Sequence, residues 1–68
     1  MFPRKTLDDL KGRELEIFIK DLPNPYCIQI GKIKVVTEHV VILDDTEWKD
    51  RVITIPIENI LMIKEILE

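Results

Sequence analysis

The sequence predicts an all-β fold, in which a short N-terminal helix precedes five strands that form a small, strongly bent antiparallel barrel. Three observations predict it. Apolar and polar residues alternate early in the chain, short apolar runs are separated by polar turns, and the apolar positions change phase at a glycine. With 68 residues, 46% of them hydrophobic, the chain is expected to form a single domain over residues 1–68.

The first two elements follow from a cap signal and a change of period. Residues 6–11 are expected to form one or two helical turns, because Thr6 can cap a helix and Gly12 stands just past its end. From residue 13 the apolar residues recur at every second position. This period predicts a half-buried strand over residues 13–20, and the proline-containing stretch after it predicts a turn.

The second strand, expected over residues 26–36, carries the signal for the bend. Tyr26, Ile28 and Ile30 would share one face, whereas the next apolar residues fall on the other phase. The change of phase falls at Gly31. A glycine inside a strand at such a point is typical of a β-bulge or a sharp bend, and a long bent strand is how a small barrel turns its corner.

Three further strands are expected, over residues 39–44, 51–56 and 59–66. Pro56 would end the second of these at a tight turn, where no ladder bond is lost. The last segment is also compatible with a helix over residues 59–68. The β-branched residues at its beginning favour the strand.

Composition excludes several classes of function. The net charge of −3 argues against a surface that attracts phosphate backbones everywhere. Cys27 is the single cysteine and His39 the single histidine, so neither an internal disulfide nor a metal site is expected, and no cofactor is expected. No signal peptide and no membrane segment are predicted, which indicates a cytoplasmic protein.

The sequence contains no catalytic constellation, and an enzyme is not expected. There is no serine, and the carboxylates around residues 44–50 have no histidine beside them in the sequence to form an acid–base pair. Trp48 lies within this acidic loop. Its indole can serve as an exposed interaction anchor, or it can fold back over one end of the barrel.

The order of elements and three motifs carry a resemblance. "LKGRELEIFI" at residues 10–19 follows the form of the first strand in the Sm and Sm-like family, and Gly31 with Ile33 follows its bent second strand. "IPIENI" at residues 55–60 matches the second family signature at its first, fifth and sixth positions. The chain thus resembles a divergent Sm-like protein. The resemblance implies an SH3-like barrel, RNA as the ligand class, and a homo-oligomeric ring of about five to seven subunits.

The departures from the family pattern lie at the RNA pocket. Of the residues that would handle a base, the chain keeps His39 as a stacking residue and Asn59 in the second signature. Thr37 stands in place of an aspartate, and Val41 in place of the asparagine that would read a base edge. Pro56 and the isoleucine after it replace an arginine and a glycine. The resemblance therefore implies an altered pocket that is not specific for uridine.

Each nucleic-acid candidate has an ordinary structural interpretation beside it. His39 is either a stacking residue or a turn histidine at the surface. Lys32 and Lys34 alternate with apolar residues and are expected on the outer face of the bent strand. They can contact phosphates there, or they can form an ordinary solvated strand face.

Self-association is the expected support for so small a core, because exposed strand edges pair unless they are blocked. The expected contact residues lie in the last two strands: Ile53, Ile55, Ile60, Leu61, Met62 and Ile63. The alternative function is an SH3-like module that binds a partner protein through Trp48, or an accessory subunit of a larger assembly.

Overall fold

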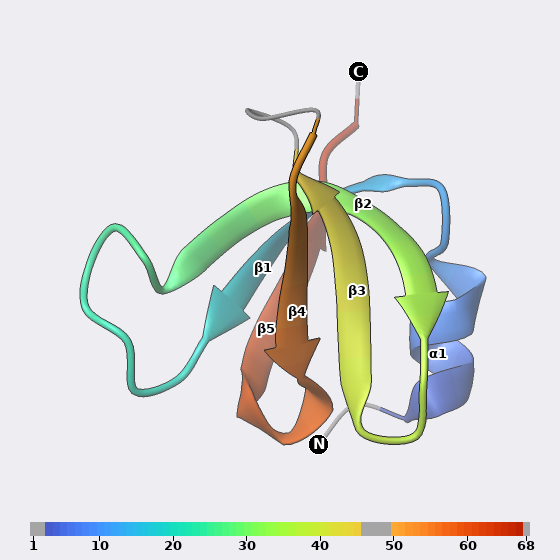
Figure 1. Cartoon of the computed structure of the whole chain (residues 1–68), viewed down its shortest axis with the longest axis horizontal. Helices are drawn as coiled ribbons and strands as arrows, with labels where there is room; N and C mark the ends of the chain where they lie inside the picture. Colours follow the sequence, from blue (N-terminus) through green and yellow to red (C-terminus); the bar gives the residue numbers. More distant parts are fainter. Residues whose placement is uncertain (1–2, 46–49, 68) are drawn as a thin grey trace.

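The computed structural model describes residues 3–45 and 50–67. One antiparallel sheet of five strands, in the order β4-β3-β2-β1-β5, accompanies one short α-helix, so the predicted all-β, barrel-like fold is confirmed (Figure 1). The elements are α1 (Arg4–Asp9), β1 (Glu14–Ile19), β2 (Ile28–Val36), β3 (Val40–Asp45), β4 (Val52–Pro56), the 3-10 turn η1 (Ile57–Asn59) and β5 (Ile60–Glu65).

The helix begins earlier than predicted. Pro3 is the N-cap residue, no side chain caps the helix, and Thr6 lies inside α1, so the predicted cap is wrong. Proline favours this start because its φ is fixed near the helical value and the first turn does not use its missing N–H. Gly12 follows the helix with φ of 81°, as expected. No helix formed by residues 3–45 and 50–67 is long and apolar enough to cross a membrane.

The alternation predicted for the first strand is confirmed. Leu15, Ile17 and Ile19 are buried, whereas the residues between them are only half-buried. Side chains of neighbouring strands that stand opposite each other share a face. The inward direction of these three side chains therefore fixes which residues of β2 and β5 point inward.

Strand β2 joins the two layers of the sheet. Its first part pairs with β1, its second part pairs with β3, and only Gly31 and Lys32 pair with both. The strand curves from the layer that contains β1 and β5 to the layer that contains β3 and β4 (Figure 1).

The break in pairing lies at Lys34 and not at Gly31 as predicted. The register against β3 shifts between Ile33 and Val35, and Val36 is the next inward residue. The apolar phase misled the prediction because both faces of the strand are apolar. Ile30 is 40% exposed on the outer face, and Gly31 continues the inward positions.

Gly31 is required by a close contact between strands. A Cβ atom at this position would clash with the backbone carbonyl oxygen of Asp44 in β3. Because backbone is the obstacle, no change of side-chain rotamer relieves the clash. The glycine therefore allows β3 to approach β2 at the point where the strand passes between layers.

The C-terminal segment forms a strand over Ile60–Glu65, so the alternative helix over residues 59–68 is wrong. Strand β4 ends at Pro56, as predicted, and a single 3-10 turn leads into β5. Ile57 in this turn and Ile60 at the start of β5 are buried. Their burial anchors the connection, which explains why a short apolar run here does not form a helix.

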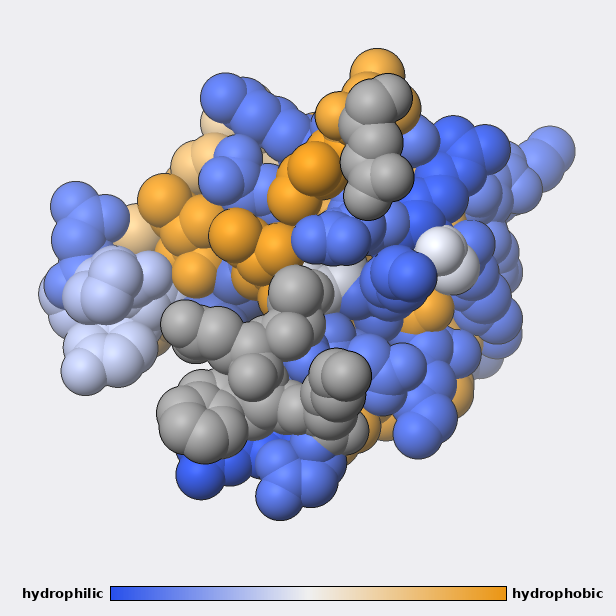
Figure 2. Space-filling view, turned by 90° about the horizontal axis from the view of Figure 1, so that it is seen from above, coloured by the Kyte–Doolittle hydropathy of each residue, from blue (hydrophilic) through white to orange (hydrophobic). Residues whose placement is uncertain are grey.

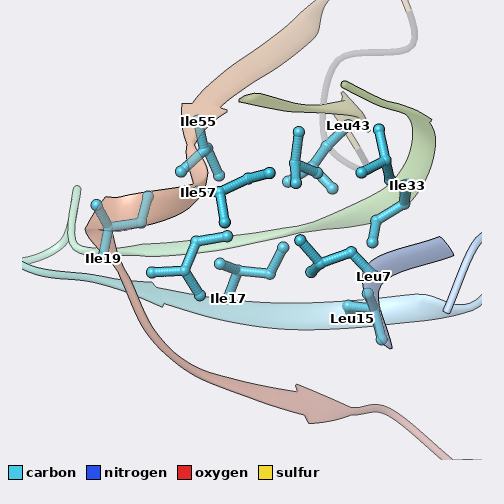
Figure 3. Packing of buried hydrophobic residues seen from close by; sticks show 11 residues of the cluster. Leu7, Leu15, Ile17, Ile19, Ile33, Leu43, Ile55 and Ile57 are labelled. Atoms are coloured by element: carbon cyan, nitrogen blue, oxygen red, sulfur yellow. The ribbon is translucent and has the colours of Figure 1, made fainter. Parts of the chain in front are cut away.

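The core lies between the two layers and is closed by the helix. Leu7 of α1 points into the same cluster as Leu15 and Ile33 (Figure 3). No polar or charged residue among those described is buried. The cluster comprises Leu7, Leu15, Ile17, Ile19, Ile33, Val36, Val41, Leu43, Ile55, Ile57 and Ile60.

The substitution Gly31→Ala is expected to destabilise the fold by about 1–3 kcal/mol, because the added methyl group forces the β2 and β3 backbones apart. Urea denaturation monitored by circular dichroism measures this change. Lys34→Ala is the control, since this exposed side chain can be removed without a clash. An unchanged denaturation midpoint for Gly31→Ala would contradict the close approach.

Candidate functional site

His39 lies at a small pocket between the β2–β3 turn and the β4–β5 connection. We call it the His39 pocket. Its volume is about 330 Å³, and its lining consists of Glu38, His39, Val40, Pro56, Ile57 and Glu58. The two chain segments are those in which the resemblance implies an RNA pocket, and the structure brings them together.

A backbone hydrogen bond joins the two segments. The N–H of Ile57 donates to the carbonyl oxygen of His39 over 2.9 Å. Ile57 itself is buried in the core, with 3% of its surface exposed. The backbone at His39 is thus tied to a fixed point of the fold, although the imidazole is exposed.

Thr37 shapes the turn that presents His39. Its Oγ1 accepts hydrogen bonds from the backbone N–H groups of His39, at 3.3 Å, and Val40, at 3.0 Å. The backbone N–H of Thr37 donates to the Val40 carbonyl oxygen over 2.9 Å. A threonine hydroxyl that accepts from the backbone two or three residues on stabilises a tight turn. The sequence prediction matched Thr37 to a family aspartate but missed this role.

Carboxylates flank the His39 pocket on both sides. Glu38 precedes the histidine and Glu58 comes from η1, and both side chains are exposed. Negative charges at this place repel phosphate groups and attract cations. Sequence reasoning missed this feature. The sequence did contain a signal, because Glu38 directly precedes His39 and Glu58 directly precedes Asn59.

Asn59 lines a different pocket. This second pocket, which we call the β4-edge pocket, has a volume of about 390 Å³ and lies between β4 and the end of β1. The carbonyl oxygen of Asn59 accepts a hydrogen bond from the N–H of Lys20 over 2.8 Å. His39 and Asn59, which the resemblance joins in one base pocket, therefore line separate pockets, and Pro56 lines both.

Lys32 and Lys34 are exposed on β2, as expected, and line neither pocket. Lys32 stands opposite Glu14 of β1 on one side and Asp44 of β3 on the other. Directly opposed cross-strand residues are about 5 Å apart at Cβ, so these carboxylates compete with any phosphate for the ammonium group. The arrangement favours the interpretation of a solvated strand face.

The predicted contact residues fall into three groups. Ile55 and Ile60 belong to the core, with 2% and 5% of their surface exposed, and Ile55 also lines the β4-edge pocket. Ile53 and Ile63 are partly buried and pack against that core. Leu61 and Met62 are 63% and 43% exposed. Trp48, the predicted interaction anchor, lies outside the described residues.

Among residues 3–45 and 50–67, no group of three or more His, Cys, Asp or Glu side chains is arranged to hold a metal ion. The Cys27 thiol is unpaired as a disulfide and lies 2.8 Å from Oδ1 of Asn24, to which it donates. Comparison with protein-family models, curated proteins and solved structures gives no match for this chain. The Sm-like resemblance thus stays a prediction from the sequence.

The substitution Thr37→Val is expected to lower the free energy of unfolding by about 1 kcal/mol, because two turn N–H groups lose their acceptor. Thr37→Ser keeps the hydroxyl and should retain the wild-type stability. Urea denaturation of the three proteins measures the difference. Equal midpoints for the valine and serine variants would show that the hydroxyl does not hold the turn.

Proposed function

We propose that this protein is a non-catalytic, Sm-like structural subunit that self-associates edge to edge into a closed homo-oligomer. The proposal is carried by one observation, the strand order β4-β3-β2-β1-β5. In this order β4 and β5 are the two ends of the sheet, and among the described residues neither has a second neighbour. Both strands therefore present unpaired backbone groups along one side.

The two edges are different, and this determines the kind of assembly. Pairing of β4 of one copy with β5 of the next copy leaves a free β4 and a free β5 at the ends of every open chain. Such a head-to-tail contact repeats until the rotation closes a ring. A ring of about five to seven copies is the form that the sequence resemblance implies.

Exposed apolar side chains accompany the two edges. Val52 of β4 is 55% exposed. In β5, Leu61 is 63% exposed and Met62 is 43% exposed, and Leu67, beyond the end of this strand, is 79% exposed. Figure 2 shows a patch of hydrophobic residues bordered by hydrophilic ones on the face that it presents. Burial of such surface favours association by about 25 cal/mol per Å² removed from water.

The proposal also includes nucleic acid as the ligand class. One backbone contact supports this part. The bond between the Ile57 N–H and the His39 carbonyl oxygen unites the two segments that handle RNA in the resembling family. Glu38 and Glu58 weaken attraction to phosphate, so binding would depend on stacking against the imidazole. A cytoplasmic location belongs to the proposal as well.

A peptide-binding module is the second candidate. The β4 edge lies beside an apolar pocket, and an extended peptide can add a strand to an edge of this kind. The two candidates differ in solution mass, because the module remains monomeric without its peptide. Measurement of the mass in solution separates them.

The wild-type protein is expected to sediment as a closed oligomer, and the variant Val52→Lys with Thr54→Lys is expected to sediment as a monomer. Two lysines on the edge strand block strand pairing by charge and desolvation. Sedimentation velocity and native mass spectrometry measure the mass, and circular dichroism checks that both proteins are folded. A monomeric wild-type protein at all concentrations would overturn the proposal and favour the peptide-binding module.

The double substitution Glu38→Gln with Glu58→Gln is expected to raise the affinity for single-stranded RNA. A unit charge about 4 Å from a phosphate is worth about 1 kcal/mol in water, so each neutralised carboxylate contributes about fivefold at low salt. Fluorescence anisotropy with labelled oligouridine and oligoadenine measures binding. Asp9→Asn, an exposed residue of α1 that does not line the His39 pocket, is the control. Absence of RNA binding by all three proteins at low salt would overturn the nucleic-acid part.

A further inference from the structure

The β4-edge pocket lies where an incoming strand would meet β4. Its volume is about 390 Å³, which is within the range of ligand pockets. Apolar side chains from β1, the turn after it and β4 form half of the lining, and the polar residues come from that turn, β2, β4 and η1. The lining residues are Ile19, Lys20, Asp21, Leu22, Gln29, Ile53, Thr54, Ile55, Pro56 and Asn59.

The opposite edge of the sheet carries an apolar side chain that its own protomer leaves uncovered. Leu61 is 63% exposed. By contrast, Ile60 before it is buried, and Ile63 packs against the core. Pairing with β1 shifts between Phe18 and Ile19, so that Ile19 stands opposite Ile60 and Phe18 opposite Met62. Leu61 is therefore the extra residue of a β-bulge and has no partner on β1.

Alternation of the two faces selects the register between the edges. Opposed residues of paired strands share a face, and a slip by one residue would place Lys64 on the side of the core. Inward residues of β4 must therefore meet inward residues of β5. Ile53 opposite Ile63 of a second copy satisfies this condition, and the same antiparallel register sets Ile55 opposite Leu61.

Registers shifted by two residues fit less well. One of them places Glu65 opposite Ile53, and the other places Asn59 opposite Ile55. Only the register between them gives both isoleucines an apolar partner. It also sets Thr54 opposite Met62 on the outer face.

We infer that Leu61 of one copy inserts into the β4-edge pocket of the next copy and is the main anchor of the contact. The inference rests on the edge-to-edge assembly proposed above and adds the residue and the pocket that hold it. The pocket is larger than one leucine side chain, so the whole β5 bulge enters it. Inside the pocket, Leu61 contacts Ile55 and Pro56. The occupant is a second copy of this chain because both complementary edges, each without another strand neighbour among the described residues, belong to the same molecule.

The test compares two leucines of the full-length protein. Leu61→Ala is expected to raise the dissociation constant of the contact about tenfold or more, as truncation of a central anchor does. Leu61→Met, which conserves volume, should stay close to the wild-type protein. Leu67→Ala is the matched control, because Leu67 is more exposed but lies beyond the end of β5. Sedimentation velocity over a concentration series measures the constants.

Mixing two defective variants tests the direction of the contact. The β4 variant with Val52→Lys and Thr54→Lys keeps an intact Leu61, and a Leu61→Lys variant keeps an intact β4-edge pocket. Each alone should be monomeric, and an equimolar mixture should give a 1:1 heterodimer, since one complementary pair of edges remains. A mixture that stays monomeric, with both variants folded, would overturn the inference.

Disulfide formation tests the register directly. In a Cys27→Ser background, Thr54→Cys with Met62→Cys is expected to give disulfide-linked multimers on oxidation, because directly opposed residues satisfy disulfide geometry. Thr54→Cys with Lys64→Cys probes the shifted register and should not form them. The opposite pattern would place Leu61 outside the pocket and overturn the inference.

The outcomes separate the inference from the assembly on which it rests. If Leu61→Ala assembles as tightly as the wild-type protein while the β4 variant is monomeric, the assembly stands and the anchor is overturned. If the wild-type protein is monomeric, both are overturned. In that case, binding of an apolar dye that Leu22→Lys abolishes would assign the β4-edge pocket to a small molecule instead.

Discussion

The close approach of β2 and β3 at Gly31 is the constraint on which the rest of the structure depends. At Gly31 and Lys32 strand β2 pairs with both β1 and β3, and a side chain at Gly31 would collide with the Asp44 carbonyl oxygen. The resulting bend places β3 and β4 opposite β1 and β5, so that the inward side chains of both layers share one core. The same bend holds the ends of the sheet apart, which leaves an edge on β4 and an edge on β5 without a strand neighbour among the described residues.

The features proposed for function are two pockets that follow from this geometry and share Pro56 as a lining residue. The His39 pocket forms where the β2–β3 turn meets the β4–β5 connection, and its shape is held by short bonds within and between backbones. The β4-edge pocket forms where the sheet fails to close. A small protein with a thin core commonly gains stability from association. In this fold, the surface left open by incomplete closure would provide that association.

The sequence predicted a strand correctly where apolar and polar residues alternate strictly. The prediction failed where both faces of a strand carry apolar residues. Strand β1 alternates strictly, and its inward residues were identified correctly from Leu15 onward. In β2 apolar residues occupy both faces, so the pattern alone placed the break at Gly31 when the ladder breaks at Lys34. The start of α1 was missed because proline at Pro3 replaces a side-chain cap. At the candidate site, His39 was identified, but the glutamates beside it were not, because their proximity depends on how two turns meet.

Pro56 forms a wall of both pockets, and this has a consequence for regulation. Its ring fixes the backbone φ. A neighbour that presses on Pro56 from the β4 edge would change the shape offered to a ligand beside His39. By thermodynamic linkage, the ligand would change the affinity between copies by the same factor. A single rigid residue would thus allow an assembled ring and a separate subunit to differ in what they bind.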